Sequence, residues 1–161
     1  HWGGTSVIEI IVLGEPVAQA RAKFTTVNGY ARAYDPARSR HYKEYIRLAA
    51  AAKAPEKLLS GPIDLEVRIY RPIPKSFGKR KSEAADRGLI RPTTKPDNDN
   101  YIKGIKDALK GIIWHDDSQV VDEKTSKYYS KKPRVEIKIK EIVYELPTSY
   151  KKSTTRNRVL R

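Results

Sequence analysis

The chain contains no cysteine, and only three of its 161 residues are histidines. The absence of cysteine excludes disulfides, thiolate-bound zinc and a cysteine nucleophile together. It fits a reducing cytoplasm, which is the location we expect. No apolar run approaches the roughly 20 residues that a membrane-spanning helix needs, and no basic start with an apolar core indicates a signal peptide. We therefore expect no segment that spans a membrane.

Positive charge is what the chain has in excess. Lys and Arg number 33 against 19 Asp and Glu, which gives a formal net charge of +14. Such a balance favours an anionic partner, with nucleic acid as the first candidate and an anionic membrane as the second. A membrane-surface role needs a basic amphipathic helix, which the sequence does not show convincingly, so we expect no membrane partner. The hydrophobic content of 39% indicates a folded globule rather than a disordered basic protein.

The length suits one domain. Residues 1–5 begin His-Trp-Gly-Gly and are expected to be tag or processing residues. Residues 6–146 are expected to fold. Residues 147–161 carry five basic side chains and no acid, and we expect a flexible tail there. The mixture of strand and helix patterns predicts a single α+β domain.

Alternation and turn signals predict the strands. Residues 63–70 alternate apolar and polar side chains, and residues 7–13 are rich in β-branched side chains. Asn28-Gly29 between two extended flanks predicts the tip of a hairpin. Two more strands, near 119–129 and 135–143, are expected to form a second hairpin with each other.

Two long helices and a short one are predicted. Asp35-Pro36 is a helix start signal, and the helix should run to about residue 53. Apolar residues at three- and four-residue steps predict a second long helix over about 98–112. A short helix is expected near 79–87, inside a basic stretch rich in proline and glycine.

Acidic residues gather around the second long helix of this basic chain. Asp97 and Asp99 lie at its start, Lys103 follows one turn after Asp99, and Asp116-Asp117 come after its end. A turn there could fold the last pair back toward the first. Converging carboxylates form an oxygen-lined site for Mg²⁺, and a pair of ions about 3.5–4 Å apart can activate water and neutralise the leaving oxygen of a phosphodiester. A nearby lysine could stabilise charge on the phosphate.

Each of these residues also has an ordinary structural explanation. Asp97 suits the cap position of the helix. Asp99 and Lys103 could form a surface ion pair of small worth. Asp116-Asp117 is a common turn signal. Spacing alone leaves the metal site and the structural roles both open.

The same residues resemble the core motif of the RusA Holliday junction resolvases. The matching positions are Lys95-Pro96-Asp97-Asn98-Asp99-Asn100, Lys103, Asp107-Ala108-Leu109, Gly111 and Asp116-Asp117-Ser118-Gln119-Val120. The stretch from Gly14 to Arg40 is similar to the N-terminal portion of that family, although its basic, proline-containing run is reduced here to Arg21 and Lys23. The resemblance covers about residues 7–143.

The resemblance implies a homodimeric endonuclease that resolves four-way DNA junctions by paired symmetric nicks in recombination and repair. It implies Mg²⁺ as cofactor, with Mn²⁺ as a substitute, no small-molecule cofactor, and a bacterial or phage origin. It also implies a mixed α/β sandwich over residues 6–146. Carried over by position, Asp97, Asp99 and Asp117 bind metal, with Asp116 as the neighbouring alternative, and Lys103 is catalytic. A two-fold dimer suits a junction of near two-fold symmetry.

Basic segments supply candidate DNA contacts. The candidate DNA-binding residues are Arg21, Lys23, Arg32, Lys75, Phe77, Lys79, Arg80 and Lys95. The charged members would bind phosphates with a steep salt dependence, and Phe77 is the candidate to stack on unpaired bases at the junction centre. We expect Trp114 to pack in the interior or an interface, and His115 to be a passive neighbour of the acids.

Two other functions stay open at this point. A restriction-type nuclease would use Asp97 with Glu136-Ile137-Lys138 on a strand, although such an acid-x-lysine triplet arises easily in an amphipathic strand. A non-catalytic nucleic-acid-binding protein would use the acids only to cap helices. It would bind junctions and show no Mg²⁺-dependent nicking.

Overall fold

The computed structural model describes residues 6–20, 23–27, 30–34, 37–144 and 146–147, with residues 23–27 and 30–34 described as backbone only. The expectations for residues 1–5 and for the basic tail beyond residue 147 lie outside this part. The elements are β1 (Val7–Leu13), β2 (Lys23–Val27), β3 (Tyr30–Tyr34), α1 (Ala37–Ala51), β4 (Ile63–Pro72), α2 (Lys79–Asp86), α3 (Asn98–Leu109), the 3₁₀ turn η1 (Asp117–Gln119), β5 (Val120–Ser130) and β6 (Arg134–Glu141). None of the described helices is long and apolar enough to cross a membrane.

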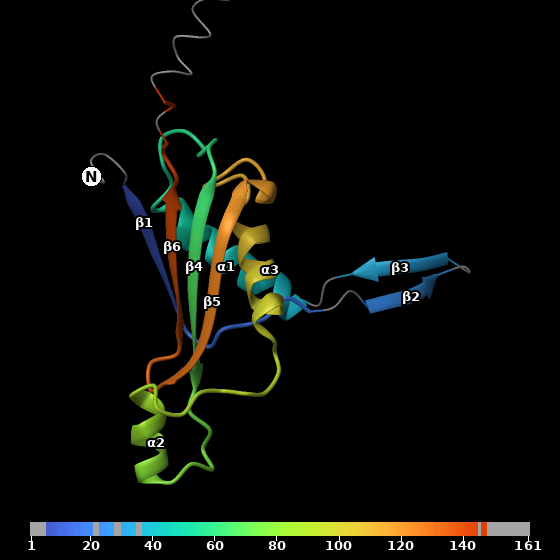
Figure 1. Ribbon diagram of the computed structural model, residues 1–161. Coiled ribbons are helices and arrows are strands. Elements are labelled where there is room, and N and C mark those ends of the chain that lie inside the picture. Colours follow the sequence, from blue (N-terminus) through green and yellow to red (C-terminus); the bar gives the residue numbers. More distant parts are fainter. Residues whose placement is uncertain (1–5, 21–22, 28–29, 35–36, 145, 148–161) are drawn as a thin grey trace, which may run out of the picture.

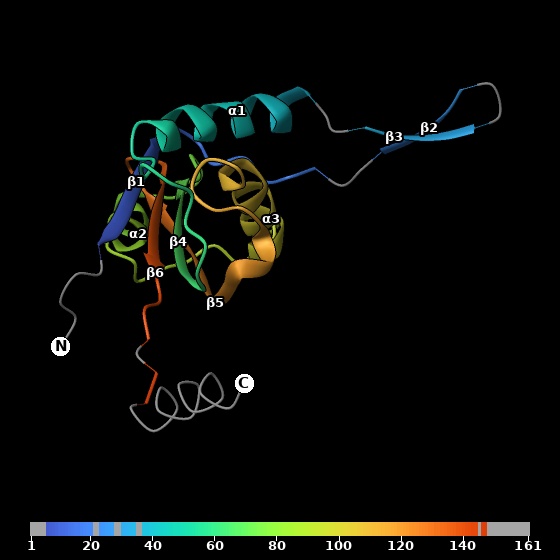
Figure 2. The same cartoon turned by 90° about the horizontal axis from the view of Figure 1, so that it is seen from above.

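One mixed four-stranded sheet organises the domain. Its strand order is β1-β6-β4-β5, with β5 parallel to β4 and the other two pairs antiparallel. Helices α1 and α3 cover one face of the sheet, and the opposite face is left open by the described elements (Figures 1 and 2). The expected α+β architecture is confirmed.

The expected hairpin between the last two strands is wrong. Strand β4 lies between β5 and β6 and pairs with both of them. Every inward-facing side chain of β4 from Ile63 to Ile69 is fully buried, which suits the interior of a sheet. Strand β5 has the sequence VVDEKTSKYYS, which has too few apolar residues for that position. It therefore takes an edge.

The first predicted hairpin is confirmed. Strands β2 and β3 pair antiparallel with Val27 opposite Tyr30. The expected tip, Asn28-Gly29, lies outside the described residues. The hairpin stands away from the body of the domain in both views (Figures 1 and 2).

The core lies between the sheet and the two long helices. The periodic apolar residues of α3, Ile102, Ile105 and Leu109, are buried against it together with Ile46 of α1. Each such side chain contributes about 1.5–3 kcal/mol when fully buried. Helix α3 ends at Leu109 rather than at residue 112. Gly111 follows with φ of 80°, a left-handed conformation that turns the chain away from the helix axis.

Candidate functional site

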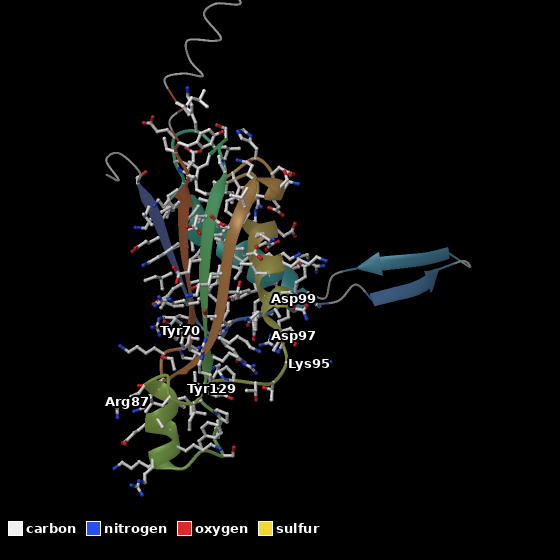
Figure 3. All side chains as sticks on the ribbon, in the orientation of Figure 1. Tyr70, Arg87, Lys95, Asp97, Asp99 and Tyr129 are labelled. Carbon is white, nitrogen blue, oxygen red and sulfur yellow. The ribbon has the colours of Figure 1, made fainter. Side chains whose placement is uncertain are left out.

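The start of α3 places Asp97 and Asp99 at the positive end of the helix dipole. Asp97 occupies the cap position, as predicted, but its side chain makes no capping hydrogen bond with the described residues. Its backbone carbonyl instead accepts from the amides of Asn100 and Tyr101. Asp99 is exposed in the first turn. Figure 3 shows both aspartates at this end of α3, with Lys95 just before them on the incoming loop. Both carboxylates are thus available to a ligand.

Edge strand β5 holds the loop that delivers these acids. Lys127 Nζ donates to the carbonyl oxygens of Thr94 and Pro96, each at 3.1 Å. Arg71 Nη1 donates to the same Thr94 oxygen at 3.1 Å. Asn98 Nδ2 donates to the Thr125 carbonyl at 3.1 Å and fixes the first residue of the helix. These contacts set the position of Asp97. Sequence reasoning missed Lys127, because its side chain reaches the loop before Asp97 only when β5 is paired with β4.

Lys103 lies one turn after Asp99 on the same side of α3. It is exposed, and within the described part of the chain it forms no ion pair with Asp99 or with any other acid. The surface ion pair that the spacing allowed is therefore not formed. Asp107 bonds Lys43 of α1 at 2.9 Å and so ties the two helices together.

Asp116 belongs to a hydrogen-bonded turn beyond the other end of α3. Its carboxylate accepts from the amide of Ser118 at 3.0 Å and from the Ser118 hydroxyl, and it pairs with Lys110 Nζ at 3.2 Å. The Ser118 hydroxyl, then the Ser118 amide and Lys110, lower the pKa of Asp116 to about 2. The side chain of Gln119 completes a capping box by accepting from the Asp116 amide. Asp116 therefore stabilises the turn.

Asp117 accepts a hydrogen bond from the indole of Trp114, with Nε1 and Oδ1 2.9 Å apart. Trp114 is fully buried, so its predicted packing role is confirmed. The turn η1 that begins at Asp117 is bound to the start of β4, because Gln119 Nε2 donates to the carbonyls of Leu59 and Gly61. Asp117 is thereby fixed beside the beginning of the parallel pair β4–β5.

The expected convergence of three acids within one subunit is not found. Asp99 is the second residue of α3, and the ten residues that follow it to Leu109, at about 1.5 Å each, put about 15 Å of helix between Asp99 and the end that leads to the turn with Asp116 and Asp117. Among the described residues, no group of three acidic or histidine side chains could hold a metal ion. The structure brings together Asp97, Asp99 and Lys103, and it keeps Asp116 and Asp117 at the opposite end.

The candidate DNA contacts occupy different parts of the molecule. Lys75, Lys79 and Arg80 are exposed in and before α2. Phe77 is partly buried, with its ring edge-on to Tyr129 at 5.6 Å and Lys81 Nζ 4.1 Å above it. Lys23 belongs to β2 and Arg32 to β3, so both are in the β2–β3 hairpin. Arg21 is outside the described residues. Of the candidates whose side chains the structure describes, Lys95 is the one next to Asp97 and Asp99.

A known protein family matches the part of the chain that contains these acids and lysines. A family model described as "Endodeoxyribonuclease RusA" matches residues 14–140. The chain belongs to the RusA family of endodeoxyribonucleases. A protein of Bacillus subtilis (strain 168), "Uncharacterized protein YqaN", is 52% identical over 137 residues, which cover 84% of this chain and 96% of that protein. The RusA match contains both ends of α3 and the segment before the hairpin.

A restriction-type centre fits this RusA fold poorly. Glu136 of β6 pairs with Arg134, with Nε and Oε2 2.9 Å apart. Its neighbour Ile137 is buried toward the helices, so Glu136 and Lys138 face the open side of the sheet. Asp97 starts a helix that covers the other side. The structure therefore separates the two halves of that alternative centre.

Proposed function

We propose that the protein is a structure-selective endodeoxyribonuclease that resolves four-way DNA junctions by paired symmetric nicks, in DNA recombination and repair. The observation that carries this proposal is a pair of carboxylates, Asp97 and Asp99, that engage no described residue and lie at the positive end of a helix in a RusA-family chain of net charge +14. A basic protein that keeps acids free of structural partners is suited to metal-dependent chemistry on a polyanion.

The donor set at the start of α3 fits Mg²⁺, with Mn²⁺ as a substitute. Magnesium is commonly held by one or two carboxylates, with water and substrate phosphate oxygens completing the coordination. Asp97 and Asp99 supply two such carboxylates without first breaking a bond to a described residue. A bound ion supplies an activated water and neutralises charge on the leaving oxygen.

Lys103 and the start of α3 contribute positive charge beside the negative carboxylates of Asp97 and Asp99. The ammonium of Lys103, which has no ion-pair partner among the described residues, would stabilise the negative charge that builds on the phosphate being cut. The positive end of the dipole of α3 favours an anionic group at the same place. The scissile phosphate would thus lie between the acids and the lysine.

The homodimer gives Asp117 a place in this proposal. The RusA resemblance assigns Asp117 to the metal site, yet in its own subunit Asp117 lies beyond the other end of α3, with about 15 Å of helix between that end and Asp99. A two-fold dimer with two active sites facing one junction can bring an acid from each chain to one site. We infer that Asp117 of the partner subunit completes the site.

Junction cleavage tests the activity. A synthetic immobile four-way junction is incubated with the protein, with and without Mg²⁺, and the strands are resolved on a denaturing gel. Paired nicks at symmetry-related positions that require the metal are expected. Junction binding without nicking, in Mg²⁺ or in Mn²⁺, would show a non-catalytic binding protein and refute the proposal.

Mixed dimers test the shared site. Subunits carrying Asp99→Asn and Asp117→Asn are refolded together and given a plasmid with an extruded cruciform. If Asp117 acts across the dimer, each mixed dimer retains one intact site, and the mixture yields nicked circles although each variant alone is inactive. If both acids act within one chain, both sites of the mixed dimer are inactive and the plasmid stays supercoiled.

A further inference from the structure

A groove of about 380 Å³ opens beside the start of α3. Three parts of the fold form its walls: the extended segment 15–20, the end of β4, and the loop and first turn that carry Lys95, Asn100 and Tyr101. Arg38, at the start of α1, closes another side. The groove therefore adjoins Asp97 and Asp99 without containing them.

The charged residues of the groove are mainly cationic. Arg38, Arg71 and Lys95 line it against a single acid, Glu15. The closest approach of Arg38 to Glu15 is 4.0 Å, and both side chains are mostly exposed, at 71% and 62%. An exposed pair at that distance is weak. Arg38 can consequently exchange Glu15 for a phosphate at little cost.

Arg71 is held in place while most of its donors stay available. Its Nη1 donates to the Thr94 carbonyl, which uses one of the five N–H groups of a guanidinium. The planar fork of an arginine matches two oxygens of a phosphate. The bond to Thr94 thus orients Arg71 in advance.

The opposite wall is fixed by close packing of backbone. The amide of Gln19 donates to the carbonyl of Asn100 at 3.0 Å, and the amide of Ala20 approaches Ser39 Oγ at 3.4 Å. A Cβ added at Gly104 would come within 3.3 Å of Gln19 Cβ. Glycine at this position lets the segment lie directly on α3. The groove is therefore formed before any ligand arrives.

We propose that this groove binds the sugar-phosphate backbone of the cut DNA strand, next to the scissile phosphate. The identity of the ligand rests on the proposed nuclease function. The volume is that of a pocket for a small ligand, so it admits a nucleotide or two of one strand and not a duplex. Lys95 connects the two sites, because it lines the groove and lies two residues before Asp97. A strand held by Arg38 and Arg71 enters the site at the start of α3.

The salt dependence of binding tests the groove separately from cleavage. Arg38→Ala, Lys95→Ala and the double variant are prepared in an Asp99→Asn background, and junction affinity is measured by fluorescence anisotropy over a series of KCl concentrations. Each lost phosphate contact should lower the slope of log K against log salt by about 0.9. The matched control is Lys57→Ala, because Lys57 is also exposed and lies beyond the opposite end of α1. Lys57→Ala should leave the salt slope unchanged, and Arg38→Lys should retain most of the slope of the parent Asp99→Asn protein.

The position of the strand is tested by crosslinking. Because the chain has no cysteine, Arg38→Cys carries a unique thiol. It is reacted with junctions that bear a thiol-reactive tether on one phosphate, placed either beside the cut or far out in an arm. Crosslinking beside the cut is expected, and crosslinking only in the arm would overturn the proposal.

The outcomes separate the two proposals. If the unmodified protein nicks junctions but the Arg38 and Lys95 variants bind with the slope of the Lys57 control, the groove is wrong and the nuclease stands. If the slopes fall as expected but no metal supports nicking, the groove binds DNA and the nuclease is wrong.

Discussion

The two ends of α3 carry aspartates of the same kind in opposite circumstances. At the start, the carboxylates of Asp97 and Asp99 engage no described partner. Beyond the end, Asp116 accepts two hydrogen bonds from Ser118 and an ion pair, and Asp117 accepts the indole proton of Trp114. Both oxygens of Asp116 are engaged, so Asp116 stabilises its own turn. Asp97 and Asp99 keep their capacity for a cation, and Asp117, bonded to a described residue only through Oδ1, retains part of that capacity. Motif membership alone does not separate these two cases.

The largest effect should come from the unengaged acids. Asp97→Asn or Asp99→Asn should lower the single-turnover rate of junction cleavage by about 100- to 1,000-fold, because a metal ligand and its charge are lost at the transition state. The melting temperature should stay close to that of the unmodified protein, because no described bond is removed. A fully active Asp99→Asn protein would show that the acids at the start of α3 have no catalytic role that distinguishes them from Asp116.

The second-largest effect on the cleavage rate should come from Lys103. Lys103→Ala should reduce the cleavage rate by about 100-fold through the loss of one charge beside the phosphate. Junction affinity in the absence of metal should change little, which anisotropy would show. Lys106→Ala is the matched control, because Lys106 is a lysine of the same helix whose Nζ is paired with Glu123 at 2.9 Å. Equal losses in the two variants would argue against a special role for Lys103.

A smaller effect is expected from the residue that positions the acids. Lys127→Met removes the donors to the Thr94 and Pro96 carbonyls and should lower the cleavage rate by about 10-fold, in the range seen when support behind a metal ligand is removed. Junction affinity should be retained, and a higher Mg²⁺ concentration should restore part of the rate. Lys127→Arg, which keeps a donor, should recover much of the activity. A loss of melting temperature with an unchanged metal requirement would instead mean a purely structural role.

The smallest effect on cleavage should come from Asp116. Asp116→Asn should leave the rate near that of the unmodified protein and lower the melting temperature slightly at neutral pH. The folded pKa of Asp116, about 2, is below its ordinary value. Its ionised form therefore stabilises the fold above about pH 4, and this contribution is lost as the pH falls toward 2. Thermal melts of both proteins between pH 7 and pH 2 should converge at the acid end. A constant difference across that range would contradict the assignment.

The sequence by itself determined most elements and one half of the site. Hydrophobic periodicity predicted α3 and β4, and the start signal Asp35-Pro36 predicted α1. The spacing of Asp97, Asp99 and Lys103 placed them on neighbouring turns of one helix. These are local properties, because side chains three or four residues apart share a helix face whatever the rest of the chain does.

Only the tertiary structure decided where the remaining charged residues lie. The parallel pairing of β5 with β4 sends Asp117 to the far end of α3 and turns Lys127 toward the loop before Asp97. Arg38, Arg71 and Lys95 come from three separate segments and meet only in the folded chain. Strand partners and groove walls depend on contacts between residues far apart in sequence, which no local pattern records.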